Sequence, residues 1–136
     1  MKPSDPIIIR MRSLAREASA QAYAPYSRFM VGAAVLTEDG EVFTGCNVEN
    51  SSFSLTMCAE RGALFQAISK GHRTIRAVVI FTPTELPSPP CGACLQVMCE
   101  FGPDAEVFSF CRSGELLHAR AGEMLPHAFA LNPGIE

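Results

Sequence analysis

The sequence predicts an α/β protein built on a mixed β-sheet, and two observations carry that prediction. Residues 31–38 and 41–48 flank Asp39-Gly40, a dipeptide typical of β-hairpin turns. Residues 75–82 contain the run Ala77-Val78-Val79-Ile80-Phe81, which is typical of a strand buried on both faces. The hairpin is followed by helix, strand, helix and strand patterns. A layered sandwich with both parallel and antiparallel strand pairs accounts for this order.

Two helices are predicted from apolar periodicity and from the residues that end it. Apolar residues recur at helical spacing over residues 6–22, which predicts an amphipathic helix that ends before Pro25. Residues 58–69 have the same spacing and a stop signal at Gly71. The first helix therefore precedes the hairpin, and the second lies between the hairpin and the buried strand.

In the rest of the chain, proline and glycine residues mark the predicted ends of helices and strands. Residues 92–101 are predicted as a further helix, closed by Gly102-Pro103. The remaining segments are predicted as a proline-rich loop at 82–90, short strands at 105–110 and 115–119, and an extended surface tail after Gly122. Together with the hairpin and the buried strand, this gives a sheet of five strands.

Length and composition predict a single domain over residues 1–136. Its apolar fraction of 48% and charged fraction of 18% are ordinary for a compact protein. The net charge is −3 and the 11 Lys and Arg are scattered, so a nucleic-acid partner is not expected. The apolar run Ile7-Ile8-Ile9 is too short for a signal peptide or membrane span. We expect a cytoplasmic protein with reduced cysteines.

The most informative motif is Cys58-Ala59-Glu60-Arg61 followed by Pro90-Cys91-Gly92-Ala93-Cys94. Cys58, Cys91 and Cys94 offer three protein ligands, and a tetrahedral Zn²⁺ held by three ligands keeps one position open, as catalytic zinc sites do. Water at that position ionises near neutral pH, and Glu60 beside it could move protons. The motif predicts one catalytic Zn²⁺ with Glu60 as the acid–base residue.

The neighbouring residues are consistent with this prediction. Cys58 and Cys91 are each predicted at the start of a helix, where the free N–H groups favour thiolate over thiol. Three thiolates and one Zn²⁺ sum to one negative charge. Arg61 could withdraw that charge by donating hydrogen bonds to the sulfurs. Spacing alone does not bring Cys58 to the other two cysteines.

Two other interpretations of the cysteines remain open at this point. Cys91-Gly92-Ala93-Cys94 has the spacing of a thioredoxin-like redox pair, but this leaves Cys58 and Glu60 unexplained. A structural zinc-binding module without enzymatic activity needs a fourth ligand, and Cys99 is the obvious candidate. Five residues beyond Cys94 on a helix, Cys99 would point away from the shared face. The histidines at 72, 118 and 127 lie far from the motif and are interpreted as surface or packing residues.

Several separated blocks show that the chain resembles the small homotetrameric zinc cytidine deaminases. A zinc ligand two residues before Glu, followed by Pro-Cys-x-x-Cys, is the signature of zinc nucleobase deaminases. The matching blocks are Ala24-Pro25-Tyr26-Ser27-Arg28-Phe29, Val31-Gly32-Ala33-Ala34, Gly45-Cys46-Asn47-Val48-Glu49-Asn50, the two cysteine motifs with Gln96, Leu125-Pro126 and Ala128-Phe129. They occur in the family's order over nearly the whole chain.

The resemblance implies a three-layer α/β/α sandwich with a mixed five-stranded sheet and a homotetramer with shared active sites. It implies hydrolytic deamination of cytidine and deoxycytidine to uridine and deoxyuridine, with one Zn²⁺ per subunit, for pyrimidine salvage. It also implies roles for individual residues. Cys58, Cys91 and Cys94 would bind zinc, Glu60 would carry protons, Asn47 and Glu49 would bind the ribose from a strand, Ala59 would read the pyrimidine edge through its backbone, Phe29 would pack on the ring, and Phe129 would enter from a neighbouring subunit.

Two positions depart from the family pattern. Leu95 follows the last cysteine where arginine is usual, so one positive charge near the metal or the subunit interface is missing. Phe53 stands where tyrosine is frequent and lacks its phenolic hydroxyl. These departures put substrate preference and interface detail in question. The rival hypothesis is a deaminase of a modified cytosine nucleoside such as a blasticidin-type antibiotic, although Asn47 and Glu49 favour an ordinary ribonucleoside.

Overall fold

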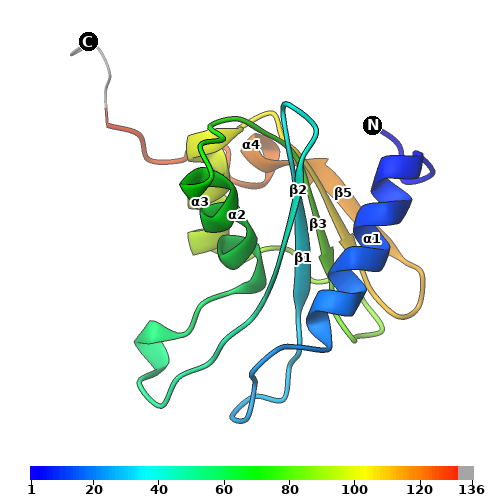
Figure 1. Cartoon of the computed structure of the whole chain (residues 1–136), viewed down its shortest axis with the longest axis vertical. Helices are drawn as coiled ribbons and strands as arrows, with labels where there is room; N and C mark the ends of the chain where they lie inside the picture. The colour runs from blue at the N-terminus through cyan, green and yellow to red at the C-terminus, as the bar shows by residue number, and fades with distance from the viewer. Residues whose placement is uncertain (132–136) are drawn as a thin grey trace.

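The structure, a computed structural model that describes residues 1–131, is a mixed five-stranded sheet between two helical layers (Figure 1). The strand order is β2-β1-β3-β4-β5. The strands are β1 Gly32–Thr37, β2 Val42–Cys46, β3 Ile75–Phe81, β4 Glu106–Phe110 and β5 Leu116–Arg120. Strands β3 and β4 pair in parallel, and every other neighbouring pair is antiparallel. The predicted fold class is confirmed.

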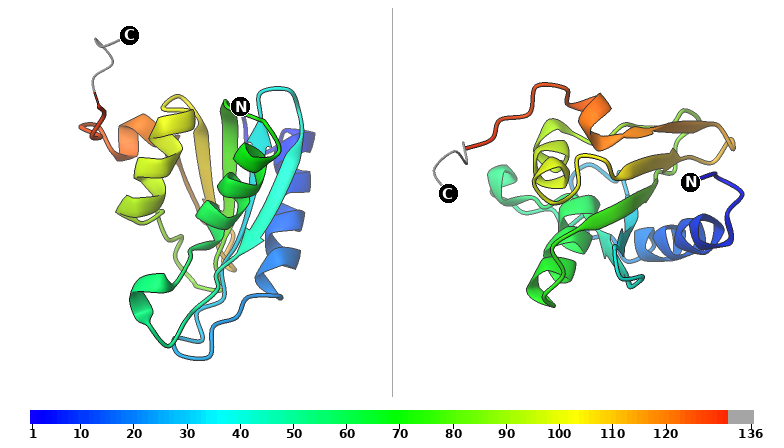
Figure 2. Two further views of the ribbon diagram at one scale, coloured as in Figure 1. Left: turned by 60° about the vertical axis from the view of Figure 1, so that its left-hand side comes forward. Right: turned by 90° about the horizontal axis from the view of Figure 1, so that it is seen from above.

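The helices divide between the two faces of the sheet. Helix α1 covers one face, and α2 and α3 lie side by side on the other (Figure 2). Their bounds are α1 Pro6–Ser19, α2 Ala59–Ser69, α3 Gly92–Phe101 and α4 Ala121–Met124, with a 3₁₀ helix at Phe53–Leu55. No helix among residues 1–131 has the length and apolar character needed to cross a bilayer.

Strand β3 joins the two halves of the core because its side chains are buried on both faces. Ala77 and Val79 pack in the cluster under α1, while Val78 and Ile80 pack in the cluster under α2 and α3. Burying a valine or isoleucine side chain contributes about 1.5–3 kcal/mol. The uninterrupted apolar run therefore holds both helical layers, as the sequence predicted.

The β1–β2 hairpin and the end of α1 differ from the sequence prediction. Gly40 has a φ of +94° whereas Asp39 does not have a positive φ, so the connection is not the two-residue turn expected for Asp-Gly. The Thr37 N–H donates to the Glu41 carbonyl, which encloses a three-residue loop with glycine in the left-handed conformation. Helix α1 ends at Ser19 rather than at residue 22, and Ser19 Oγ donates to the Arg16 carbonyl.

The prediction of an extended tail after Gly122 was wrong for its first residues, which belong to α4. The side chain of Glu123 accepts a hydrogen bond from the Arg120 N–H, which caps the short helix. The Gly122 N–H donates to the Pro103 carbonyl, and Ala121 is fully buried. The contact with Pro103 is made to a distant part of the chain, and four residues are too few to show a helical periodicity, so the sequence did not indicate this helix. Residues 125–131 have no regular secondary structure.

Helix α2 lies unusually close to β2 at Gly45. A Cβ atom on Gly45 would lie 2.5 Å from the Ala59 carbonyl oxygen and 2.7 Å from the Ala63 backbone nitrogen. Such contacts are too short for any side chain, so only glycine lets the first turn of α2 rest on the strand. This contact fixes the end of α2 that carries the cysteine motif.

Candidate metal centre and active site

The predicted metal ligands come from the N-terminal ends of two neighbouring helices. Cys58 is the residue immediately before α2, and Cys91 holds the same position before α3, both with extended backbone dihedrals. Cys94 lies in the first turn of α3 and is buried. Both helices begin at the end of the sheet where β3 finishes. The fold thereby brings Cys58 to the other two cysteines.

The distances between the three thiols fit one zinc ion. All three sulfur atoms lie within 4.8 Å of one another, and Cys58 Sγ is 3.8 Å from Cys91 Sγ. Tetrahedral Zn²⁺ with Zn–S bonds of about 2.3 Å places its sulfurs about 3.8 Å apart. The soft donor set and this spacing are compatible with one Zn²⁺.

Hydrogen bonding favours ionisation of Cys58. Hydrogen bonding to the Cys94 thiol, and then to the Arg61 guanidinium, lowers the pKa of Cys58 to about 5. Arg61 Nη2 donates to Cys58 Sγ over 3.3 Å, and this contact raises the pKa of the guanidinium further. The pKa of the Cys94 thiol is raised, first by its hydrogen bond with Cys58 and then by burial. A thiolate at Cys58 is thus available for a metal, since thiolate is the metal-binding form.

Glu60 is the buried acid beside the thiols. It lies in the first turn of α2 with 6% of its surface exposed. Burial penalises the charged carboxylate and raises the pKa of Glu60 to about 7, and the negative charge on Cys58 adds to this effect. A carboxyl group with this pKa can both accept and donate a proton near neutral pH.

A cavity of about 190 Å³ lies next to these residues. It brings together six predicted site residues from separate parts of the chain, two of which are predicted metal-ligand cysteines. These are Phe29, Asn47, Cys58, Ala59, Glu60 and Cys91. The lining is mostly apolar with a few polar groups, which is typical of a pocket for a small organic molecule.

Sequence reasoning missed the other residues that line the cavity: Val31, Thr56, Ile80, Thr82, Ser88 and Pro89. Their proximity to the motifs was a usable signal for Thr56, Ser88 and Pro89, which precede Cys58 or Cys91 by two or three residues. Ile80 and Thr82 gave no such signal, because the run in which they lie indicated only a buried strand.

Asn47 and Glu49 lie beyond the end of β2 and hold the loop that carries Phe29. Asn47 Oδ1 accepts from the Val31 N–H at 2.8 Å, and Asn47 Nδ2 donates to the Phe29 carbonyl at 2.6 Å. Glu49 accepts hydrogen bonds from the N–H groups of Tyr26 and Ser27 and from the Ser27 hydroxyl. The expected strand over 41–48 was wrong past Cys46, where only isolated bridges at Val48 remain.

Glu49 faces a second, more open cavity of about 430 Å³, which it lines with Tyr26, Ser27, Phe53 and Thr56. Thr56 lines both cavities, so the two are neighbours. Hence the two residues predicted to bind ribose do not lie side by side on one regular strand. Asn47 lines the cavity beside the thiols, and Glu49 lines the outer cavity.

The three remaining positions of interest lie outside the 190 Å³ cavity. Phe129 is 69% exposed on the C-terminal segment, and its carbonyl accepts a hydrogen bond from Gln96 Nε2. Phe53 is 72% exposed on the 3₁₀ helix and meets the Tyr26 ring edge-on at 5.7 Å. Leu95 is buried in the core under α2 and α3, so an arginine at this position would have to bury its charge within this chain.

The alternatives left open by the sequence fit the geometry less well. Within residues 1–131, the thiol cluster contains three cysteines, and Cys99 lies outside it. A closed four-cysteine site is therefore not formed by this chain's described residues. A redox pair at Cys91 and Cys94 would leave unexplained why Cys58 and the buried Glu60 share the same cavity wall.

Fold and donor set together define a class of protein: an α/β zinc-site protein with a buried acid–base residue beside the metal ligands. Comparison with known proteins identifies the family. The family model for the cytidine and deoxycytidylate deaminase zinc-binding region matches residues 8–110, and the chain belongs to this family.

Individual relatives agree along most of their length. The cytidine deaminase of Halalkalibacterium halodurans is 49% identical over 114 residues, which cover 83% of this chain and 86% of that protein. The crystal structure of the Burkholderia pseudomallei cytidine deaminase superimposes with a TM-score of 0.85 at 48% identity, covering 89% of this chain and 98% of that one. A cyanophage dCMP deaminase, at 24% identity and a TM-score of 0.53, shares the fold.

Proposed function

We propose that this protein catalyses the zinc-dependent hydrolytic deamination of cytidine and deoxycytidine. Water adds to the base and ammonia leaves, so the products are uridine or deoxyuridine. The observation that carries the proposal is the cavity in which a buried Glu60 and two of the three clustered thiols meet. The names of the relatives, which are cytidine deaminases at up to 49% identity, support the choice of substrate.

Cys58, Cys91 and Cys94 would hold the zinc ion through their thiolates. When bound, zinc supplies the Lewis acidity that makes a water molecule nucleophilic near neutral pH. Arg61 donates to the Cys58 sulfur, so it would reduce the excess negative charge of three thiolates. This hydrogen bond keeps the donor set from weakening the metal as a Lewis acid.

Glu60 would carry protons through the reaction. It would take one proton from the attacking water and deliver it to ring N3 of the base, and it would then move the proton of the added hydroxyl to the departing amine. Burial supports this role, because the raised pKa of about 7 places the carboxyl where both directions of proton transfer are accessible. The Ala59 N–H, at the start of the same helix, would read the pyrimidine edge.

Phe29, Asn47 and Glu49 would bind the nucleoside. Phe29 and Asn47 line the cavity with Glu60, which supports contact with the base and the adjoining sugar. The remaining N–H of the Asn47 amide and the remaining lone pairs of Glu49 would serve the ribose hydroxyls. Because both side chains also fix the loop at residues 26–31, they would orient Phe29 as well as bind substrate.

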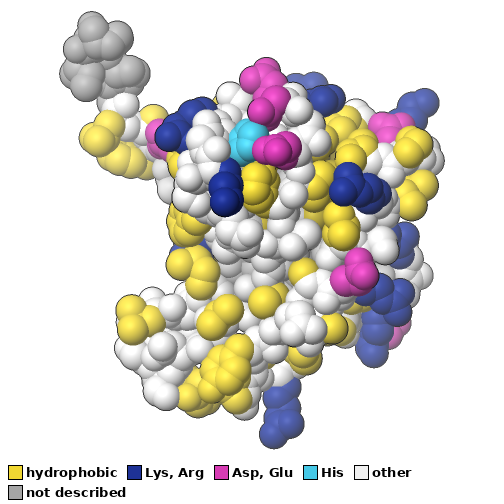
Figure 3. Space-filling model, viewed as in Figure 1, with side chains coloured by type: hydrophobic (Ala, Val, Ile, Leu, Met, Phe, Trp, Pro, Cys, Tyr) yellow, Lys and Arg dark blue, Asp and Glu magenta, His cyan; other side chains and the backbone are white. Residues whose placement is uncertain are grey.

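A homotetramer with shared active sites is part of the proposal. Apolar side chains gather on the lower part of the face in Figure 3, and the exposed hydrophobic residues Phe53, Leu55, Phe129 and Leu131 are available for subunit contact. Phe129 would enter the site of a neighbouring subunit, since it lies outside its own cavity. We further propose that residues 1–136 act as one domain in the cytoplasm, without a nucleic-acid partner.

The decisive experiment is ammonia release from cytidine by the purified zinc-loaded protein, compared with the isosteric variant Glu60→Gln. We expect the variant to keep zinc and fold and to lose several orders of magnitude in kcat, because it removes the proton carrier. Glu17→Gln on α1 is the matched control and should retain wild-type activity. Substantial activity in Glu60→Gln would refute the assigned role.

The same assay separates the rival substrate. If the zinc-loaded protein releases no ammonia from cytidine or deoxycytidine but does so from a modified cytosine nucleoside of the blasticidin type, the chemistry stands and the substrate changes. If neither is deaminated by zinc-loaded protein, a structural role for the metal replaces the enzymatic proposal.

A further inference from the structure

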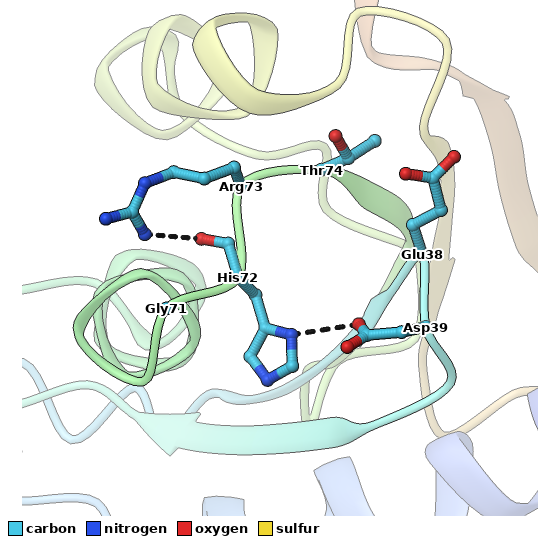
Figure 4. A pocket seen from close by; sticks show the side chains of 6 residues that line it. All are labelled: Glu38, Asp39, Gly71, His72, Arg73 and Thr74. Carbon is cyan, nitrogen blue, oxygen red and sulfur yellow. Dashed lines mark hydrogen bonds and ion pairs between the residues drawn. The ribbon is translucent and has the colours of Figure 1, made fainter.

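A second cluster of potential metal ligands lies at the other end of the sheet from the thiols. It consists of Asp39 in the β1–β2 connection, Glu41 at its end, and His72 in the turn between α2 and β3. His72 and Asp39 point toward each other across the mouth of a cavity (Figure 4). We call these three residues the hairpin cluster.

His72 is held in one orientation. Its side chain is 11% exposed, and its ring packs against Phe43 with centroids 5.4 Å apart. Its Nδ1 lies 2.9 Å from Asp39 Oδ1, and its Nε2 contacts a carboxylate oxygen of Glu41. Both ring nitrogens therefore face carboxylates. The sequence had suggested only a surface or packing role for this histidine, and such a role does not require two carboxylate partners.

Asp39 is also oriented and kept ionised. Thr37 Oγ1 donates to Asp39 Oδ1 at 2.8 Å. This hydrogen bond is the largest cause that lowers the pKa of the Asp39 carboxyl, and contact with His72 lowers it further. An ionised carboxylate is the form that binds metal ions.

The two carboxylates favour a positive charge at His72. A neutral imidazole carries one N–H and one lone pair, so it can donate to only one of its two carboxylate neighbours. The other nitrogen then presents its lone pair to an anionic oxygen. Either a second proton or a metal cation removes this repulsion. A metal cation would also be attracted by the negative charge of both carboxylates.

We propose that His72, Asp39 and Glu41 bind a divalent first-row transition-metal cation. Their ligand atoms lie within 4.8 Å of one another, and one imidazole with two carboxylates suits zinc, nickel or cobalt. The adjoining cavity of about 330 Å³ leaves room for water to complete the coordination. This site is chemically distinct from the thiol site because it offers no sulfur.

The other charged groups around the cavity are compatible with this. Glu38 and Arg73 also line it. Arg73 Nη1 donates to the carbonyls of Ile68 and His72, and this holds the guanidinium on the backbone of the turn. Figure 3 shows a histidine between acidic side chains near the upper edge of the molecule. A bound cation would tie the β1–β2 hairpin to the turn that follows α2.

The test is equilibrium dialysis of the zinc-loaded protein against Ni²⁺ at pH 7.5, with both metals counted per chain. We expect one saturable equivalent of Ni²⁺ in addition to the zinc. His72→Gln and Glu41→Gln should each weaken Ni²⁺ binding at least tenfold, whereas Glu38→Gln, in the same cavity but outside the cluster, should not. Lowering the pH to 5.5 should weaken binding as protons compete for the imidazole.

A second measurement covers the possibility that His72→Gln disturbs folding. Ni²⁺ at a concentration that just saturates the wild-type protein should raise its Tm by several degrees and raise the Tm of Glu41→Gln clearly less, because the stabilisation falls as the dissociation constant rises. Absence of a saturable second equivalent below millimolar Ni²⁺ would overturn the proposal. Equal binding by wild type, His72→Gln and Glu41→Gln would overturn it as well, since the ion would then sit elsewhere.

Discussion

The two ends of the sheet carry clusters of similar size and opposite chemistry. Cys58, Cys91 and Cys94 form a soft sulfur cluster backed by one guanidinium and a buried acid. The hairpin cluster combines one imidazole with two exposed carboxylates. Three ligand atoms within 4.8 Å are common to both. Compactness alone therefore does not distinguish a catalytic centre from an accessory site.

What separates the two is their surroundings. The thiols adjoin a largely apolar cavity in which Glu60 is buried and its pKa is raised to about 7. Asp39 and His72 of the hairpin cluster line a cavity together with the charged residues Glu38 and Arg73, and the acids among these lining residues are exposed. We therefore expect the loss of a ligand to abolish chemistry at the first cluster and to affect only cation binding at the second.

The largest effect is expected for Cys91→Ala. Loss of one of three thiolates should remove most of the bound zinc, lower deaminase activity by at least a thousandfold and reduce the free energy of unfolding, because metal binding is coupled to folding. Metal analysis and thermal melts measure both effects. Cys99→Ala, outside the cluster on the same helix, is the matched control. Unchanged zinc content in Cys91→Ala would remove this residue from the ligand set.

The acid limb of the pH profile should follow Glu60. Its pKa is raised from its ordinary value to about 7, and only the ionised form accepts a proton, so kcat/KM should be high above pH 7. It should fall about tenfold per pH unit below that value. The residual rate of Glu60→Gln should lack this limb. A limb that persists in the variant would point to another titrating group.

A smaller effect is expected at Phe129. If the Phe129 ring completes a neighbouring subunit's site, Phe129→Ala should raise KM for cytidine about tenfold with little change in kcat. Leu131→Ala is the control, because Leu131 is also exposed and lies nearby in the sequence. Steady-state kinetics together with sedimentation measure substrate affinity and assembly separately. A normal KM in a variant that still forms tetramers would show that Phe129 contributes only to packing.

The smallest effect is expected at the hairpin cluster. His72→Gln should change kcat/KM for cytidine less than twofold, because the residue lies at the end of α2 remote from Glu60. The measurement is deamination by zinc-loaded protein without added Ni²⁺. A tenfold loss of activity with normal zinc content would mean that the two ends of the sheet are coupled.

Local patterns predicted the elements that begin and end at strong signals. Helix α3 was predicted with its observed bounds because Pro90 precedes it and Gly102 follows it. Helix α1 was predicted three residues too long, since Ala20 and Ala22 are compatible with a helix, whereas in the structure the chain closes in tighter local turns after Ser19, with the Ala20 N–H donating to the Glu17 carbonyl. Helix α4 was missed because four residues carry no usable periodicity.

For the site, sequence indicated which residues carry chemistry and not how they meet. The motif predicted the three cysteines as metal ligands and Glu60 as the proton carrier, but their approach depends on the sheet bringing the ends of α2 and α3 together. The hairpin cluster escaped sequence reasoning because His72 and Asp39 are 33 residues apart and match no ligand spacing. The hydrogen bonds that Asn47 and Glu49 make to the loop at 26–31 could likewise not be predicted from the sequence.

The close contact at Gly45 has a consequence for how this sequence can diverge. Gly45 does not itself line the 190 Å³ cavity, yet a side chain there would push the backbone of Ala59, which does line it, and would displace the adjoining Cys58. A larger residue at this position should therefore disturb the thiol site, although Gly45 has no side chain that could take part in the chemistry. The absence of a side chain at Gly45 sets how closely α2 approaches β2, and this approach positions Cys58 at the start of α2.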